Sequence, residues 1–457
     1  MREAFLERMA GFGERTALWV DGVPHSYAAL LDRIGEIRRL LAEAGARAHD
    51  AVVLEGDFSP NAVAALFALY LDRNTVVPMV GSTPVTADTV RETCAPRFTL
   101  RTADAVEVVP MSAAGAPSPA FNELAGRGAA GLVLLSSGST GTPKAILHDL
   151  DALVEQKLAK RPRGSVSLNI LMVLMFDHIG GINSLLSTML VGGAAVLPAK
   201  RTPDEICGLI EQHRIRVLPA SPTFLNLIMV GGHLERHDVS SLRLITYGTE
   251  PMSAELLARV GAAFPGVRLV QTFGTSETGI AATTSESSSS TYFKIADDST
   301  RYRVVDGELQ LKSSTQFLGY LNHPADAVTE DGWFRTGDLV EENGDGYLRV
   351  KGRATEVINV GGEKLLPLEL ESVLLTSPLV EDCVVYGRPN AITGQAVCVD
   401  VKPVGSLTRA EARAHVREFL TGRVEPFKIP SKVTVIDDIG MSDRLKKVRL
   451  RPHSDQD

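Results

Sequence analysis

Hydrophobic positions along the chain follow two alternating spacings, and each spacing predicts one kind of element. Between residues 26 and 44 apolar residues recur every three to four positions, which predicts an amphipathic helix. Short apolar runs bounded by turn residues predict buried strands. Up to about residue 280 the pattern gives strands at 51–54, 75–80, 131–135, 166–176, 194–197, 216–219, 242–247 and 267–272, and helices at 26–44, 60–71, 181–191, 222–230 and 254–264, with a further helix starting at 202. This alternation predicts an α/β fold built on two doubly wound, mostly parallel sheets.

The pattern changes in the last third of the chain. Residues 103–130 predict a poorly packed connection, and the Ser/Thr-rich residues 283–291 predict a mobile surface loop. Short alternating runs then predict a small β-barrel or antiparallel sheet, followed by a boundary near 351–355. We therefore expect an N-terminal domain over 1–352 and a smaller α+β C-terminal domain over 353–457. The expected elements after residue 300 are strands at 302–305, 308–312, 347–350, 380–386, 397–401 and 432–436, and helices at 368–376 and 409–421.

Composition and charge exclude several classes of protein. Hydrophobic residues make up 44% and charged residues 22%, as in ordinary globular proteins. The net charge of −8 argues against a general nucleic-acid binder. The apolar run 168–176 is too short to span a membrane, and residues 1–11 carry no apolar signal core, so we expect a cytoplasmic protein. Four widely spaced cysteines predict buried thiols rather than disulfides.

The clearest chemistry follows the apolar run 131–135. Gly138 and Gly141 allow the backbone to approach a ligand closely, and successive N–H groups in such a turn bind anions. Five hydroxyl residues and Lys144 add further donors; the hydroxyls belong to Ser136, Ser137, Ser139, Thr140 and Thr142. A polar surface loop is the alternative, but it would need neither the strand nor so many hydroxyls. We expect this loop to bind a polyphosphate.

The loop is not a Walker A sequence, because Pro143 precedes the lysine and Ala145 follows it. It resembles the phosphate loop of the adenylate-forming superfamily, which includes acyl- and aryl-CoA synthetases, peptide-synthetase adenylation domains and luciferases. That resemblance implies a large N-terminal domain and a mobile C-terminal domain. Further motifs of the superfamily follow in the same order.

Two motifs follow predicted strands. Residues 271–279 are similar to the motif Gln-x-Tyr-Gly-x-Thr-Glu, with Phe273 as the aromatic residue and Ser276 in place of threonine. Mg²⁺ on ATP usually has one or two carboxylate ligands, so Glu277 is the candidate metal ligand; alone it would be an ordinary surface acid. Residues 247–251 resemble the turn that presents backbone to adenine, although a plain strand-to-helix turn fits equally.

Asp338 lies in Gly-Trp-Phe-Arg-Thr-Gly-Asp, which is similar to the superfamily's ribose motif. A carboxylate is well suited to two adjacent ribose hydroxyls. The resemblance implies that Asp338 binds the ribose and that Arg353 contacts ribose or phosphate. A capping aspartate is the weaker alternative.

C-terminal motifs resemble the superfamily with departures. Gly361 and Gly362 match the glycine segment that lines the pantetheine channel in relatives, while Thr355 stands where a hinge Asp or Lys is usual. Lys446 aligns with the catalytic lysine, and Leu445 replaces the preceding glycine. A basic tail is the alternative for residues 444–451. Lys447, one position on, is expected to face elsewhere.

The acid pocket is expected around Asp177 and His178. His178 resembles a pocket-gating histidine of CoA ligases, whereas Asp177 resembles the aspartate that holds an α-amine; one register cannot satisfy both, and His178 could equally be a hydrogen-bonded core residue. The candidate pocket residues are Asp177, His178, Gly181, Tyr247, Gly274 and Thr275; the candidate ATP-binding residues are Ser136, Ser137, Gly138, Ser139, Thr140, Gly141, Lys144, Gly248, Thr249, Glu250, Phe273, Gly274, Ser276, Asp338 and Arg353. The candidate catalytic residues are Lys446, Glu277 and His178.

The resemblance implies a freestanding ATP-dependent carboxylic acid ligase. ATP, Mg²⁺ and a small carboxylic acid would give an acyl-AMP, and a thiol of coenzyme A or of a carrier protein's phosphopantetheine would then displace AMP. Three alternatives remain: an amino-acid-activating enzyme, an enzyme with a non-thiol acceptor, and an ATP-binding pseudo-enzyme. No nucleic-acid partner and no membrane span are expected.

Overall fold

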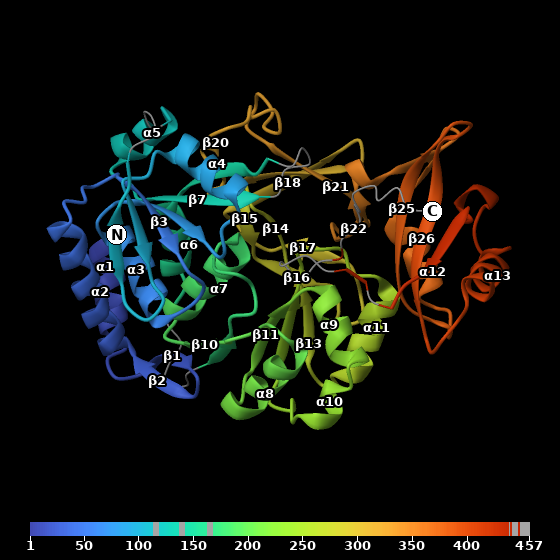
Figure 1. Ribbon diagram of the computed structural model, residues 1–457, viewed down its shortest axis with the longest axis horizontal. Coiled ribbons are helices and arrows are strands. Elements are labelled where there is room, and N and C mark those ends of the chain that lie inside the picture. Colours follow the sequence, from blue (N-terminus) through green and yellow to red (C-terminus); the bar gives the residue numbers. More distant parts are fainter. Residues whose placement is uncertain (113–117, 137–141, 162–167, 438, 441–446, 448–457) are drawn as a thin grey trace.

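The computed structural model shows a large N-terminal part and a smaller C-terminal lobe at opposite ends of the molecule (Figure 1). It describes the chain apart from residues 113–117, 137–141, 162–167, 438, 441–446 and 448–457. Helices α1–α3 lie at one end, and α12, α13, β25 and β26 form the lobe at the other. Within the described ranges, no helix has the length and apolarity needed to cross a membrane.

The first sheet carries the strands on either side of the predicted phosphate loop. Its four central strands are parallel, and β8, β6 and the short β20 are antiparallel to their neighbours. In spatial order it contains β20 (Gly319–Tyr320), β8 (Lys144–Asp149), β7 (Gly131–Ser136), β4 (Thr75–Met79), β3 (Ala51–Glu55), β5 (Phe98–Arg101) and β6 (Glu107–Pro110).

The second sheet is parallel except for β2 at its edge. In spatial order it contains β13 (Arg268–Gln271), β12 (Leu244–Tyr247), β11 (Val217–Ala220), β9 (Asn169–Leu171), β10 (Ala194–Leu197), β1 (Thr16–Val20) and β2 (Val23–Ser26). Parallel sheets need apolar cover on both faces, which explains the apolar runs in both sheets.

Helices pack between and outside the two sheets. One apolar cluster joins helices α2, α3, α6 and α7 to strands of both sheets, while α8, α9 and α11 cover the outer face of the second sheet. The N-terminal helices are α1 (Arg2–Ala10), α2 (Tyr27–Glu43), α3 (Pro60–Leu71), α4 (Pro84–Cys94), α5 (Ala120–Arg127), α6 (Leu150–Leu158), α7 (Ile179–Met189), α8 (Pro203–His213), α9 (Pro222–Val230), α10 (His233–Arg236) and α11 (Ala254–Ala263). Thr202 caps α8 as predicted: its hydroxyl accepts from Glu205 N at 3.4 Å.

An antiparallel sheet follows in the order β16 (Thr283–Ser285), β17 (Phe293–Ile295), β22 (Leu348–Arg353), β21 (Phe334–Glu342), β19 (Glu308–Ser313) and β18 (Thr300–Val305), next to the hairpin β14 (Phe273–Thr275) and β15 (Gly279–Ala281). The C-terminal lobe has its own apolar core. It contains β23 (Ile358–Val360), β24 (Glu363–Leu365), β25 (Val380–Asn390), β26 (Gly394–Pro403), β27 (Lys432–Val435), α12 (Pro367–Leu374) and α13 (Arg409–Leu420). The predicted fold class is confirmed.

Three predictions of local structure were wrong. Residues 103–130 contain β6 and α5, because Phe121 and Leu124 give this Ala- and Gly-rich segment a buried face. Of the described residues 168–176 only β9 is a strand, since the chain then leaves the sheet to enter α7. Residues 283–285 form β16, paired with β17, instead of belonging wholly to a loop.

The pattern also missed elements. The omitted helices and strands include α1, α4, β1, β2, β5 and β21. Strand β21 alternates buried and half-exposed residues along its whole length, but its polar sequence concealed it. The cysteines are free and buried, as predicted, and burial raises the pKa of the Cys94 thiol to about 11.

Candidate functional site

The described end of the phosphate loop is the start of β8. Strands β7 and β8 pair antiparallel, and Ser136 lies opposite Lys144. Ser137, Gly138, Ser139, Thr140 and Gly141 lie outside the described residues. A buried strand on each side therefore holds both ends of the loop, and Lys144 is the first residue of the returning strand.

The candidate metal motif is the turn of the β14–β15 hairpin. Thr275 Oγ1 accepts hydrogen bonds from the backbone nitrogens of Glu277 at 3.2 Å and Thr278 at 3.1 Å, which fixes the turn. A Cβ at Gly274 would lie 2.3 Å from the carbonyl oxygen of Gly279, so only glycine fits there. Phe273 is buried and stacks on Phe293 at 5.6 Å between ring centroids, so its ring belongs to the core of the antiparallel sheet.

Tyr320 brings the phosphate loop and the metal motif together. Its hydroxyl donates to Glu277 Oε1 at 2.9 Å, and the Lys144 ammonium lies 5.0 Å from the centroid of its ring. Among the described residues Glu277 Oε2 accepts no hydrogen bond, so this oxygen can face a metal ion. No described cluster of His, Cys, Asp and Glu could hold a metal alone. A single carboxylate suits Mg²⁺, whose other ligands would be water and phosphate.

His148 contacts the backbone of the candidate metal motif. Its Nε2 donates to the carbonyl oxygen of Ser276 at 2.7 Å. Burial lowers the pKa of this imidazole to about 4, so the ring is neutral at physiological pH. His148, Tyr320 and Asn322, which contacts the phosphate-loop strand β8, were not identified from the sequence. No periodic pattern marks them, because Tyr320 ends the two-residue strand β20 and Asn322 lies beyond it.

The turn after β12 is strained, as functional turns often are. Thr249 has φ +74°, a backbone conformation that residues other than glycine rarely adopt. A Cβ at Gly248 would lie 2.5 Å from Thr272 Oγ1. Glu250 Oε1 accepts from Thr223 N at 2.7 Å, at the start of α9, and buried Tyr247 ends the strand.

Asp338 and Arg353 lie opposite each other on β21 and β22. Arg353 Nε donates to Asp338 Oδ1 at 3.2 Å, and the side chain of Asp338 is only 10% exposed. The sequence predicted that both residues contact the nucleotide, but it did not predict that they form an ion pair with each other on neighbouring strands.

The candidate acid pocket lies at the start of α7. His178 caps the helix: its Nδ1 accepts from Gly180 N at 3.1 Å. Asp177 Oδ2 accepts from Val80 N at 3.2 Å and so joins this segment to the end of β4. A Cβ at Gly181 would lie 1.9 Å from the carbonyl oxygen of Met175, so no side chain fits there.

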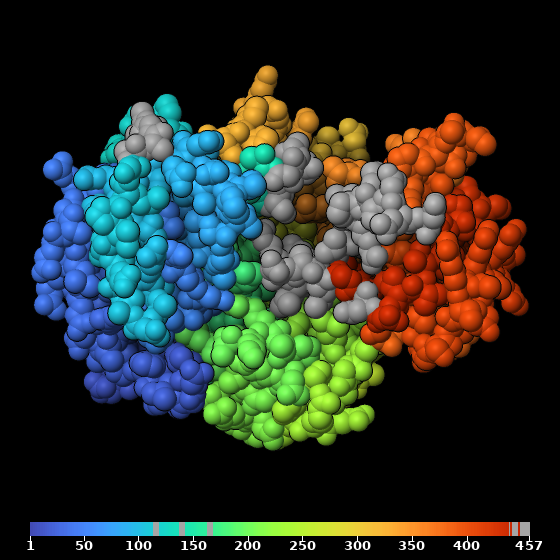
Figure 2. Space-filling view, viewed as in Figure 1, coloured from blue at the N-terminus to red at the C-terminus, as the bar shows by residue number. Residues whose placement is uncertain are grey.

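The C-terminal lobe contacts the N-terminal part through a buried polar cluster. Asp382 on β25 accepts from Asn226 Nδ2 on α9 at 3.1 Å and from Lys447 Nζ at 2.5 Å. Burial lowers the pKa of Lys447, but the Asp382 and Glu371 carboxylates outweigh it and hold that pKa above its usual range. In the space-filling view this lobe lies beside the segment that carries α8–α11 (Figure 2). Lys447 therefore faces the lobe interface.

Lys446 lies outside the described residues. The exposed Gly361 and Gly362 form the tip of the β23–β24 hairpin, with φ +63° and +99°. Among the described residues, and apart from its two chain neighbours, no atom lies within 4 Å of a Cβ built on Gly362. The described structure thus links Lys144 and Glu277 through Tyr320 and pairs Asp338 with Arg353, while Gly362 N donates to Asn359 Oδ1 at 2.9 Å within its own hairpin.

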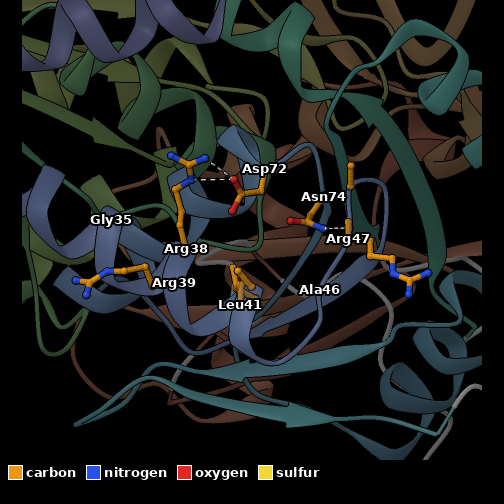
Figure 3. A pocket seen from close by; sticks show the side chains of 10 residues that line it. Gly35, Arg38, Arg39, Leu41, Ala46, Arg47, Asp72 and Asn74 are labelled. Atoms are coloured by element: carbon orange, nitrogen blue, oxygen red, sulfur yellow. Dashed lines mark hydrogen bonds and ion pairs between the residues drawn. The ribbon is translucent and has the colours of Figure 1, made fainter.

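A hollow of about 470 Å³ lies elsewhere, between α2 and the segment that follows it (Figure 3). Three exposed arginines line it, and one of them, Arg38, is paired with Asp72 at 2.7 Å. None of the predicted site residues contributes to its lining, which consists of Gly35, Arg38, Arg39, Leu41, Ala42, Ala46, Arg47, Ala48, Asp72 and Asn74. It is therefore not the predicted nucleotide site.

Comparisons with known proteins agree with the order of the motifs. The AMP-binding enzyme family matches residues 5–321, and the AMP-binding enzyme C-terminal domain matches residues 369–444. The chain is 32% identical over 347 residues to an indoleacetate–CoA ligase of Aromatoleum aromaticum, a match that covers 70% of this chain and 65% of the relative. It is 31% identical over 343 residues to a 2,3-dihydroxybenzoate–AMP ligase of Bacillus subtilis, covering 69% of this chain and 63% of the relative.

These matches span a little under two thirds of the length of the curated relatives. Among solved structures, an amide bond synthetase of Marinactinospora thermotolerans superimposes with a TM-score of 0.77 at 21% identity, over 97% of both chains. That likeness concerns the fold. The family match over most of the N-terminal part and the ordered motifs lead to one conclusion: the chain belongs to the AMP-binding enzyme family of the adenylate-forming superfamily.

Proposed function

We propose that this protein is an ATP-dependent carboxylic acid ligase that forms an acyl- or aryl-AMP and then transfers the acyl group to a thiol. The observation that supports the proposal is that Lys144, from the phosphate-loop strand, and Glu277 both contact Tyr320: the ammonium lies 5.0 Å from the centroid of its ring, and Glu277 Oε1 accepts from its hydroxyl. A cation and a metal-binding carboxylate held together are the groups that a triphosphate requires. The two relatives described above are, by name, ligases that join an aromatic acid to CoA or AMP.

Each residue would act on a separate part of the substrates. Lys144 would offset phosphate charge, Asp338 would accept hydrogen bonds from the ribose hydroxyls, and Glu277 would hold Mg²⁺, which supplies further positive charge. An oxygen of the acid attacks the α-phosphorus, the bond to the bridging oxygen breaks, and pyrophosphate leaves. Lys446, carried by the C-terminal lobe, would stabilise the negative charge that develops in this step.

In the second step the thiol sulfur attacks the acyl carbon, and AMP leaves with the electrons of the acyl–phosphate bond. We favour an acid without an α-amine, because the two relatives described above are ligases of indoleacetate and 2,3-dihydroxybenzoate, aromatic acids that carry no α-amine. An aromatic or fatty acid is the expected substrate class. The thiol would belong to coenzyme A or to carrier-protein phosphopantetheine.

Acid-dependent exchange of labelled pyrophosphate into ATP tests the first step. We expect exchange with at least one acid from a library of aryl, fatty and amino acids. Binding of MgATP without exchange for any acid would instead support a pseudo-enzyme. Products formed with and without coenzyme A then separate thioester formation from transfer to an amine or another acceptor.

A further inference from the structure

The short segment 317–322 contacts both halves of the proposed phosphate site. It adds β20 to the edge of the first sheet, where Gly319 lies opposite Leu147 and Tyr320 opposite Ile146. Backbone bonds extend this pairing on both sides: Leu318 N donates to Leu147 O at 2.7 Å, and Leu321 N donates to Ala145 O at 2.9 Å. Tyr320 is the last residue of β20, and Asn322 lies two residues beyond it.

Asn322 binds the backbone on both sides of Lys144. Its Oδ1 accepts from Ala145 N at 2.9 Å, and its Nδ2 donates to the carbonyl oxygen of Pro143 at 2.8 Å. One amide group therefore satisfies both peptide groups that flank the lysine. This arrangement restricts the backbone from which the Lys144 side chain leaves β8.

The same segment fixes Glu277 at two points. Phe317 N donates to the backbone oxygen of Glu277 at 2.6 Å, and Tyr320 donates to its carboxylate. The phenol is the donor in this contact, because an ionised carboxylate can only accept hydrogen bonds. The Tyr320 ring itself packs edge-on against Phe317, with ring centroids 4.8 Å apart.

We propose that the segment 317–322 is a splint that sets the distance between Lys144 and Glu277, with Tyr320 and Asn322 as its positioning residues. The inference rests on the proposed function and deepens it. Tyr320 orients the Glu277 carboxylate, which would bind the metal ion, and its ring lies against the Lys144 ammonium. Asn322 holds the backbone of that lysine. Groups held in place before the ligand arrives need no reorganisation during reaction.

The test compares single variants by ATP calorimetry, once with Mg²⁺ and once with EDTA. Tyr320→Phe removes only the hydroxyl. Losing an outer partner of a metal ligand typically weakens metal affinity about 10- to 100-fold. We expect a loss of at least about tenfold in MgATP affinity, less than a twofold change in EDTA, and recovery when Mg²⁺ is raised. Asn322→Ala should weaken ATP binding about equally in both media, because the lysine contacts phosphate without the metal.

Two matched controls lie away from the site. Tyr292→Phe removes a hydroxyl bonded to Glu341, and Asn343→Ala removes a side-chain oxygen that accepts from Asp345 N and Tyr347 N. Both should bind MgATP like the wild type. Thermal unfolding midpoints of all four variants identify any loss of binding that merely reflects loss of fold.

The outcomes separate the splint from the proposed function. If the wild type binds MgATP and exchanges pyrophosphate, but Tyr320→Phe and Asn322→Ala bind ATP as the controls do, the splint is wrong and the proposed function stands. If Tyr320→Phe loses affinity equally with and without Mg²⁺, its hydroxyl does not act through Glu277, and the splint is again overturned. A wild type that binds no MgATP overturns both.

Discussion

Asp338 offers the sharpest test of the nucleotide site, because its charge can be removed with almost no change in shape. Asp338→Asn keeps an oxygen that can accept from Arg353 Nε but removes the negative charge. The side chain of Arg353 is 54% exposed, so this ion pair is partly solvated and its loss should cost roughly 0–1 kcal/mol of stability. Hydrogen bonds to a charged group contribute about 1.5–3 kcal/mol, so ATP affinity should fall roughly 10- to 150-fold.

Calorimetric titration of ATP measures the affinity, and thermal unfolding measures the stability. The matched control is Asp331→Asn, which removes the charge of an exposed aspartate that pairs with Arg303 of β18 at 2.7 Å, and it should leave ATP binding unchanged. Titration with 2′,3′-dideoxy-ATP provides a second check. If Asp338 binds the ribose hydroxyls, the variant and the dideoxy nucleotide remove the same bonds, and their losses should not add. Unchanged ATP affinity, or strictly additive losses, would refute the ribose assignment.

Three further predictions concern other parts of the chain. Lys446→Ala should slow acyl-AMP formation about 10²- to 10³-fold and spare thioester formation from supplied acyl-AMP. Lys447→Ala should instead lower the unfolding midpoint, because it leaves Asp382 buried without its ammonium partner. Equal kinetic effects of the two substitutions would contradict this prediction. Gly362→Leu should spare adenylation and block thioester formation. Gly362→Ala has the same backbone strain at φ +99° but a smaller side chain, so it should block thioester formation less. Pyrophosphate exchange measures adenylation, and a thioester assay measures the second step. Burial holds the pKa of His148 near 4 in the folded state, against 6.5 in the unfolded state, so the unfolded state binds the proton first as the pH falls. The free energy of unfolding should therefore fall by up to roughly 3 kcal/mol as the pH drops from about 6.5 to 4. Urea unfolding of His148→Gln should show a shallower fall, and a pH profile identical to that of the wild type would exclude the histidine as the cause.

The sequence by itself determined the class of fold and the order of its chemistry. Continuous apolar runs bounded by turn residues located α3 and β10 at their observed bounds, because residues 62–71 of α3 and every residue of β10 are buried. The motifs around Lys144, Glu277 and Asp338 were identifiable because local residue types specify turns and ligand-binding groups. Elements without such a pattern were missed, as with the polar strand β21, which becomes half-buried only through its partners.

Only the tertiary structure decided which of these residues meet. Lys144 and Glu277 are far apart in the sequence, and the residue that contacts both, Tyr320, lies in a two-residue strand too short to have a period of its own. The hydrogen bond between Asn226 on α9 and Asp382 on β25 likewise arises from the docking of the lobe against the N-terminal part. Contacts of this kind depend on how sheets and lobes pack, and spacing along the chain carries no information about distances set by packing.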